Sequence, residues 1–374
     1  MDKKILYLVG ILGFAIGCWG LADFLSAGDA HTNYGSFVVW GLWVSLYFLF
    51  GGIATGCFIW ASLDLIFHVP SFSGTGRPAL LAALVTLVAG LAAIALDLGH
   101  MDRFWKTIFQ ANMSSGVAMD VWGYTVFGLV TVAALIVSAT EPKNPTLQAI
   151  MWIGLIVSVV VSGLPGKLMG NNAARLFWHS SLMPLQYLLQ SLMAGGAMLL
   201  VLRGIFLRDL PGEYQPGLLG KITSLLVLIN LFASYVFLTQ SLSGNMPEIA
   251  QPAQQIVFGH FSTSFWGLQI VLGSIVPLFI LFIVRGSAGS FLLGLAGLLI
   301  LLGNAVARYL VLVAGQQVDP LEGLSSSFSG KGLTLTYSPS MTEWAVACGL
   351  LGLVILGLRA GFDRFLPLAH SPKE

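Results

Sequence analysis

Charged residues are scarce in this sequence. Asp, Glu, Lys and Arg make up 9% of the 374 residues, whereas soluble proteins carry about 25% charged residues. Hydrophobic residues make up 56%, and the mean hydropathy is +0.87. A soluble fold cannot cover that much apolar surface, so the composition predicts a polytopic membrane protein. The formal net charge of +1 gives no indication of a nucleic-acid partner, and none is expected.

Metal-binding side chains are also few. The three cysteines, Cys18, Cys57 and Cys348, have no spacing typical of a metal site or a disulfide. The six histidines fall at predicted helix ends or in loops. A b-type haem in a membrane needs two histidines that face each other inside helices. The sequence therefore predicts no haem, no metal and no other permanent redox cofactor in this chain.

Long apolar runs dominate what the sequence does contain. Segments of about 20 apolar residues are long enough to cross a bilayer as helices. Ten such spans are predicted, at 5–25, 38–67, 79–99, 119–139, 147–165, 180–202, 219–242, 262–284, 288–314 and 341–360. The longest gaps between spans are 100–118, 243–261 and 315–340. Loops of this length are often functional.

The distribution of basic residues predicts the orientation. Two lysines precede the first apolar run, as in an uncleaved signal anchor. Ten spans put both termini on one side, and eleven basic residues are predicted there: Lys3, Lys4, Arg77, Lys143, Arg203, Arg208, Lys221, Arg285, Arg359, Arg364 and Lys373. Six fall on or near the other side: Arg103, Lys106, Lys167, Arg175, Arg308 and Lys331. The positive-inside rule then places both termini in the cytoplasm and the protein in the inner (cytoplasmic) membrane.

Ionisable and aromatic residues gather at the predicted outer ends of the early spans. The third span ends in "LDLGHMDRFW" (96–105). Ionisable groups at membrane depth are costly and usually face the bundle interior. Aromatic walls with a few converging polar groups suit an amphiphilic ligand with a polar head. The candidate residues from four segments are Trp43, Tyr47, Asp97, His100, Arg103, Trp122, Arg175, Trp178 and His179.

Simpler interpretations of the same residues stay open. Asp102, Arg103 and Lys106 are typical of a solvated loop with local ion pairs. Asp97 is also consistent with a buried structural acid paired with Arg103 or Arg175. The tryptophans are typical of anchors at the membrane interface. Deeper in the later spans, Arg308 and Glu343 are expected to pair with each other.

Four motifs in order resemble a known family. They are "WGLWVSLYFLFGGIATGCF" (40–58), "LDLGHMDRFW" (96–105), "AMDVWGY" (118–124) and "ARLFWHSSLMPL" (174–185). They are similar to the polysulfide reductase membrane-subunit (NrfD-like) family. "YSPSMTEW" (337–344) resembles the start of the tenth helix in its larger members, such as the hydrogenase membrane subunit. The resemblance runs from about residue 38 to 360.

The resemblance implies a fold and a function. The fold is an all-α integral membrane protein of about ten helices, in two four-helix bundles with peripheral first and last helices. The whole chain, 1–374, is expected to form one polytopic domain, with a first helix at 5–25, a bundle carrying the site at 38–202 and a second bundle region at 219–360. The function is that of a haem-free subunit that binds menaquinone or ubiquinone and exchanges electrons with a ferredoxin-like iron–sulfur subunit.

The same resemblance implies partners and residue roles. [4Fe-4S] clusters are expected in the iron–sulfur partner, which docks on the outer face and is joined by a molybdopterin or other periplasmic redox subunit, while lipid surrounds the helices. Asp97 and His179 become candidate proton acceptors. The implied quinone contacts are Trp43, Tyr47, His100, Arg103, Trp122, Arg175 and Trp178. One departure is Leu164, which precedes Pro165 and Gly166 where some members have a quinone-contacting tyrosine.

Two other functions remain open from the sequence. One is a transporter or channel without redox partners, although discontinuous helices at mid-membrane are not evident. The other is a passive membrane anchor that binds no quinone. Bound quinone would distinguish the quinone-binding subunit from the passive anchor. Iron–sulfur partners would distinguish both of these from the transporter.

Overall fold

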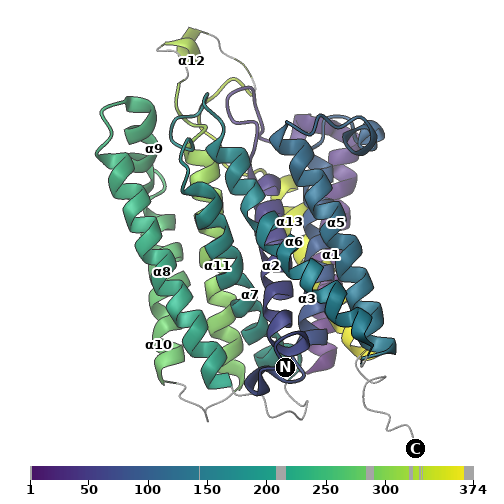
Figure 1. The fold of residues 1–374 in the computed structure, drawn as a ribbon. Coiled ribbons are helices and arrows are strands. Elements are labelled where there is room, and N and C mark those ends of the chain that lie inside the picture. Colours follow the sequence, from purple (N-terminus) through teal and green to yellow (C-terminus); the bar gives the residue numbers. More distant parts are fainter. Residues whose placement is uncertain are drawn as a thin grey trace, which may run out of the picture.

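Every described element is a helix. The computed structural model describes residues 2–142, 144–207, 216–283, 290–319, 323–327, 330 and 332–365, and within these residues it contains no strand (Figure 1). Ten of the described helices are long and apolar enough to cross a membrane. The predicted fold class, all-α with about ten membrane spans, is confirmed.

The elements follow one another in a simple order. They are α1 (Lys3–Ala27), η1 (Gly28–His31), α2 (Leu42–Leu65), η2 (Pro70–Phe72), α3 (Gly76–Asp97), η3 (Met101–Arg103), α4 (Lys106–Phe109), α5 (Gly116–Thr140), α6 (Pro145–Gly170), α7 (Met183–Val201), η4 (Leu202–Phe206), α8 (Pro216–Leu242), α9 (Pro247–Val257), η5 (Ser264–Ile275), α10 (Val276–Ile283), α11 (Ser290–Ala314), α12 (Leu324–Ser327) and α13 (Met341–Phe365). Of these, η4 and η5 are π-helices.

Most predicted span ends differ by a few residues from the observed ones, and three differences change the picture of the loops. The second span begins at Leu42 rather than at 38, because the side chain of Gln316 accepts hydrogen bonds from the backbone of Val39 and Trp40 and holds that segment as a loop. The fifth span continues past Pro165 to Gly170, since proline is tolerated inside membrane helices. The gap 243–261 contains α9. Residues 288–289, where the ninth span was predicted to begin, lie outside the described residues.

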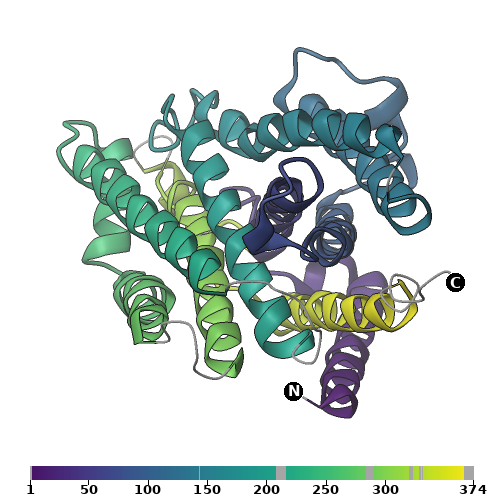
Figure 2. The same ribbon diagram turned by 60° about the horizontal axis from the view of Figure 1, so that its bottom comes forward.

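The spans between α1 and α13 form two groups of four helices, which meet at the central helix α2 and its neighbour α7. One group contains α2, α3, α5 and α6; the other contains α7, α8, α11 and the continuous η5–α10 segment (Figures 1 and 2). Helix α7 also contacts α2 and α6 and so joins the groups. Helix α2 is buried on nearly all sides, whereas α1, α5, α6 and α8 expose many large apolar side chains, as expected of helices that face lipid.

Helices α1 and α13 form a pair at the edge of the molecule. The purple and yellow ribbons lie side by side in Figure 2. Glycines allow this approach, because a Cβ atom on Gly17 would collide with the backbone of Gly349, and one on Gly13 would press on the backbone of Gly352. Small residues at such a seam let membrane helices pack closely. The pair contacts the rest of the protein mainly through α13, which packs on α3 and α2.

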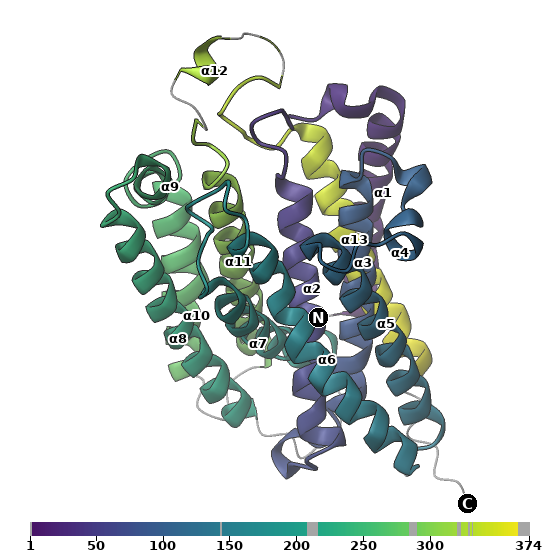
Figure 3. The same ribbon diagram turned by 45° about the horizontal axis from the view of Figure 1, so that its top comes forward.

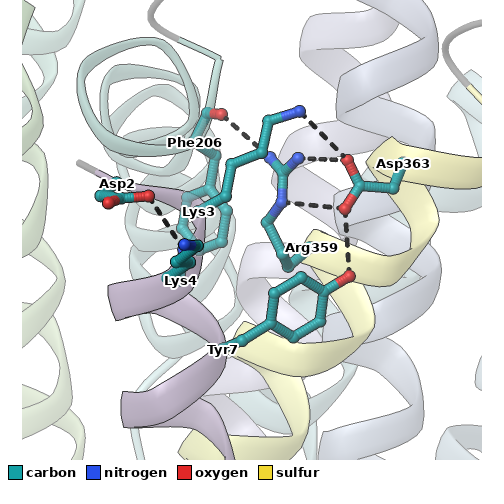
Figure 4. A network of polar contacts seen from close by, with 7 residues as sticks. All are labelled: Asp2, Lys3, Lys4, Tyr7, Phe206, Arg359 and Asp363. Carbon is teal, nitrogen blue, oxygen red and sulfur yellow. Dashed lines mark hydrogen bonds and ion pairs between the residues drawn. The ribbon is translucent and has the colours of Figure 1, made fainter.

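A polar network ties the pair together where the chain begins and ends. Asp363 accepts hydrogen bonds from the Tyr7 hydroxyl at 3.0 Å and from the Arg359 guanidinium, and Lys3 Nζ lies 3.5 Å from its carboxylate (Figure 4). Arg359 also donates to the carbonyl of Phe206 at the end of η4. The start of α1 and the end of α13 therefore lie at the same end of the molecule. We call this the terminal end, and the opposite end the cavity end.

Candidate functional site: a cavity beside Asp97

A cavity of about 690 Å³ opens at the cavity end of the molecule. It lies among the end of α1, η1, the 32–41 loop, the start of α2 and the end of α3. Figure 3 shows helices α1, α2, α3 and α13 in the same part of the molecule. Its described lining is Phe24, Leu25, Gly28, Asp29, Tyr34, Gly35, Ser36, Val39, Trp43, Leu96, Asp97, Leu98, Gly99, Met101 and Gly332. This volume falls within the range of about 300–1,000 Å³ typical of small-molecule sites.

Two carboxylates face the cavity, and its described lining contains no Lys, Arg or His. Asp97 is the last residue of α3, because Leu98 turns to an extended conformation and ends the helix. Asp29 comes from η1, and its carboxylate interacts electrostatically with that of Asp97. The remaining lining combines apolar and aromatic side chains with four glycines and Ser36, so polar and apolar groups both contribute to its surface. The cavity therefore offers hydrogen-bond acceptors beside aromatic and aliphatic side chains.

Trp43 is the buried aromatic wall of the cavity. Its ring packs edge-on against Phe24 with centroids 5.0 Å apart, and against Tyr34 at 5.6 Å. Its indole N–H donates to the backbone carbonyl of Glu343 at 3.2 Å. Because α1, the 32–41 loop and α13 all contact the ring, its orientation is fixed.

Tyr34 adds a hydroxyl group to the same wall. Its oxygen accepts from the backbone N–H of Trp43 at 3.2 Å, and its ring stacks on Tyr337 with centroids 5.8 Å apart. Burial raises the pKa of Tyr34 and that of Tyr337 well above the ordinary value for tyrosine. Both phenols are therefore neutral at physiological pH, and the Tyr34 hydroxyl keeps a proton to donate.

Tyr47 lies one turn further along α2, outside the cavity lining. Its hydroxyl donates to Asp120 Oδ2 at 3.5 Å, and its ring meets Tyr124 with centroids 5.5 Å apart. All three residues are buried. In the described structure, Asp120 Oδ1 and the Tyr124 hydroxyl lack a hydrogen-bond partner. Tyr47 therefore belongs to a second polar group, which we call the α2–α5 cluster (Tyr47, Asp120 and Tyr124).

The expected pairing of Arg308 with Glu343 is wrong. Arg308 is buried, donates to the carbonyl of Phe48 and the hydroxyl of Ser191, and lies 4.8 Å from the ring centroid of Tyr187. Glu343 instead accepts hydrogen bonds from the Tyr337 hydroxyl and the backbone N–H of Asn33. Carbonyl, hydroxyl and aromatic groups thus replace the expected carboxylate around this guanidinium.

Arg175 and Trp178 support the far side of the 32–41 loop and are absent from the cavity lining. Arg175 donates to the carbonyls of Phe37, Gln316 and Val318 at 3.2–3.4 Å. Partial burial lowers the pKa of its guanidinium from the ordinary value. Trp178 stacks on Trp40 with centroids 5.9 Å apart. These two residues position the loop rather than line the cavity.

Four other predicted residues are exposed. His100 and Arg103 lie on the segment after α3 and pair with Asp102, at 3.7 and 3.3 Å. His179 follows the buried Trp178, and Trp122 lies on the outer face of α5. The structure therefore brings Asp97 and Trp43 together in one cavity and distributes the other predicted residues around it. In the described structure neither Arg103 nor Arg175 forms an ion pair with Asp97.

Sequence reasoning missed several cavity residues. The first helix and the loop after it contribute Phe24, Asp29 and Tyr34 to the cavity. The apolar periodicity of the sequence does not indicate that the end of this helix lies beside the end of α3. An acidic residue and a tyrosine in the short connection between two spans were the available signals. Among the described residues, no group of three or more His, Cys, Asp or Glu is placed to hold a metal ion.

The fold and the cavity define a multi-pass helical membrane protein with an acidic, aromatic-walled cavity at one end of its described residues. The family described as polysulphide reductase, NrfD matches residues 31–320, and the chain belongs to this family.

Relatives of known name cover most of the chain. A selenate reductase subunit of Mesobacillus selenatarsenatis is 28% identical over 100% of this chain and 96% of its own length. The Hdr-like menaquinol oxidoreductase integral membrane subunit of Archaeoglobus fulgidus is 22% identical over 90% of this chain and 87% of its own. Protein NrfD of Escherichia coli is 22% identical over 75% of this chain and 95% of its own.

Proposed function

We propose that this chain is the haem-free quinone-binding subunit of a respiratory oxidoreductase complex. It exchanges electrons between the membrane quinone pool and an iron–sulfur partner. The observation that carries the proposal is the cavity itself, which combines Asp97 with the Trp43 wall. An isoprenoid quinol has an aromatic head with two hydroxyl donors and an apolar tail. Carboxylate acceptors beside aromatic and aliphatic side chains match that chemistry.

Relatives support the same function. The relative from Archaeoglobus fulgidus is named a menaquinol oxidoreductase subunit, and others are named subunits of selenate or dimethyl sulfoxide reductases. These relatives are named as subunits of larger enzymes. This agrees with the prediction that our chain holds no electron carrier of its own and needs a partner that does. We infer menaquinone or ubiquinone as the exchangeable substrate, a [4Fe-4S] partner of ferredoxin type, and a further redox subunit such as a molybdopterin enzyme.

The proposed role of Asp97 follows from the proton balance. Oxidation of a quinol to a quinone releases two electrons and two protons. The electrons pass to the partner, and Asp97 as a general base accepts the two protons in turn from the head group, passing the first on before it takes the second. The exposed residues after α3, with Asp102 among them, lead from there to water. Trp43 and Tyr34 orient the head group. In the reverse direction the same groups deliver protons.

The positive-inside rule supports the orientation. We propose that the terminal end faces the cytoplasm and that the cavity end, with the iron–sulfur partner docked there, faces outward across the cytoplasmic membrane. His179, although exposed, remains a candidate for proton exchange near this surface.

The first experiment replaces Asp97 by Asn in the assembled complex. This change keeps the shape and removes the basic carboxylate. Reduction of the partner's clusters by a menaquinol analogue, followed by visible absorbance, is expected to slow by about 10²-fold or more. Glu248→Gln is the control, because Glu248 is an exposed acid on α9 that does not line the cavity, and its rate is expected to stay near wild type.

A second reaction distinguishes a defect in assembly from a defect in quinol oxidation. In it, an artificial electron donor reduces the iron–sulfur clusters of the partner directly. This reaction should be unchanged in the Asp97→Asn complex. Normal quinol-dependent reduction in a fully assembled Asp97→Asn complex would remove Asp97 from the mechanism. A wild-type complex that neither binds nor oxidises quinol would favour a transporter or a passive anchor.

A further inference from the structure

The helix pair α1–α13 lies outside the residues that the family matches, which we call the shared segment. The family match covers residues 31–320, whereas α1 ends at Ala27 and α13 begins at Met341. The glycine seam holds these two helices to each other. Their position at the edge of the molecule suggests simple membrane anchors (Figure 2). At the cavity end, however, the two helices also contact the cavity and Trp43.

One side of the cavity is built by residues outside the shared segment. The last turn of α1 and η1 contribute Phe24, Leu25, Gly28 and Asp29, and the segment before α13 contributes Gly332. Opposite them, the shared segment contributes Asp97 and its neighbours at the end of α3. Without the α1 side, this face of Asp97 and Trp43 would open to lipid or water.

The same pair fixes the orientation of Trp43. Phe24 meets its ring at an interplanar angle of 87°, and the Glu343 carbonyl accepts its indole N–H. Of its three described partners, only Tyr34 belongs to the shared segment.

Helix α13 and the segment before it also hold the backbone around Trp43 in place. The Tyr337 hydroxyl accepts the backbone N–H of Leu42 at 2.9 Å and donates to the Glu343 carboxylate. Glu343 Oε1 accepts the backbone N–H of Asn33 at 2.7 Å. The loop before α2 and the first turn of α2 are therefore both bound to the start of α13.

We propose that the α1–α13 pair is an affinity-determining element that walls the cavity and fixes the orientation of Trp43, with Phe24 and Glu343 as positioning residues. This inference rests on the proposed quinone function. It follows that affinity for the quinone head group depends on side chains absent from the shared family segment. Proton transfer is assigned to Asp97, so it does not depend on the α1–α13 pair.

The test compares two phenylalanines of the same helix. Phe24→Ala removes the ring that meets Trp43, whereas Phe14→Ala removes an exposed ring on α1. In the assembled complex, Phe24→Ala is expected to raise the apparent KM for a menaquinol analogue, and the Kd of a redox-inert quinone analogue, by roughly three- to tenfold. The turnover number should stay within about twofold, and Phe14→Ala should match wild type.

Two further variants keep the test decisive. Phe24→Leu keeps most of the apolar volume, so it should assemble even if Phe24→Ala does not, and its Kd should still rise. Trp43→Ala should weaken binding at least as much as Phe24→Ala, and the double variant should add little, because both changes remove one contact.

The outcomes separate the two proposals. If Trp43→Ala weakens binding while Phe24→Ala and Phe24→Leu behave like Phe14→Ala, the wall inference fails and the quinone site stands. If Trp43→Ala leaves binding of the analogue unchanged, the proposed quinone cavity fails first.

Discussion

Asp120 and Asp97 are both acids near the cavity end, yet their surroundings differ. Asp120 is buried between α5 and α2, and its described hydrogen bond comes from the Tyr47 hydroxyl. Asp97 faces an open cavity of about 690 Å³ and a second carboxylate. Asp120 is therefore placed to anchor a helix contact, whereas Asp97 is placed to meet a ligand.

The buried position of Asp120 predicts that the Ala and Asn substitutions at this residue change the stability differently. Asp120→Ala leaves the buried Tyr47 hydroxyl without its acceptor, so the free energy of unfolding should fall by about 1–3 kcal/mol. Asp120→Asn keeps an oxygen acceptor and removes a buried charge, so stability should be retained. Unfolding of the purified protein in mixed micelles measures both, and the exposed Asp102→Ala should stay within about 0.5 kcal/mol of wild type. Equal losses in the Asn and Ala variants would mean that the charge, not the acceptor, holds the α2–α5 contact.

At the scale of elements, the membrane spans were predictable and their ends were not. Apolar length alone located all ten spans, because a helix must be about 20 apolar residues long to cross a bilayer. The start of α2 was misplaced because Gln316, far away in the sequence, binds the loop before it. The end of α6 was misplaced because proline ends helices in water more reliably than in membranes.

The sequence predicted only part of the cavity lining. Asp97 and Trp43 were candidates because ionisable and aromatic residues gather at the predicted outer ends of the early spans, and both line the cavity. The sequence did not indicate Phe24, Asp29 and Tyr34 as cavity residues, because they line the cavity only when the end of α1 packs beside the end of α3. Arg175, Trp178 and Arg308 were assigned contacts from their charge or type, but backbone carbonyls and ring stacking decide their partners. Sequence periodicity carries no information on such contacts.

At the scale of the whole molecule, the fold separates a terminal end from a cavity end. The ion pair between Lys3 and Asp363 lies at the first, and the Asp97 cavity lies at the second. Eleven of the 17 basic residues belong to the terminal side by sequence. Of these, Lys143, Arg208, Arg285 and Lys373 lie outside the described residues.

This asymmetry predicts the topology. Reporters fused to either terminus should be active in the cytoplasm, because loops rich in Lys and Arg are retained there. A reporter inserted near Gln110, between α4 and α5, should be active on the outer side. Activity of a terminal reporter only outside the membrane would invert the orientation and move the proposed partner surface to the cytoplasm.

The central claim is that a quinone occupies the cavity beside Asp97. A photoreactive quinone analogue, applied to the assembled complex in membranes and mapped by mass spectrometry, tests it most directly. The account predicts labelling within residues 24–43 and 96–101, suppressed by excess unlabelled quinone and reduced in the Trp43→Ala complex. Labelling that quinone suppresses but that falls elsewhere, such as on α8 or α11, would contradict the account.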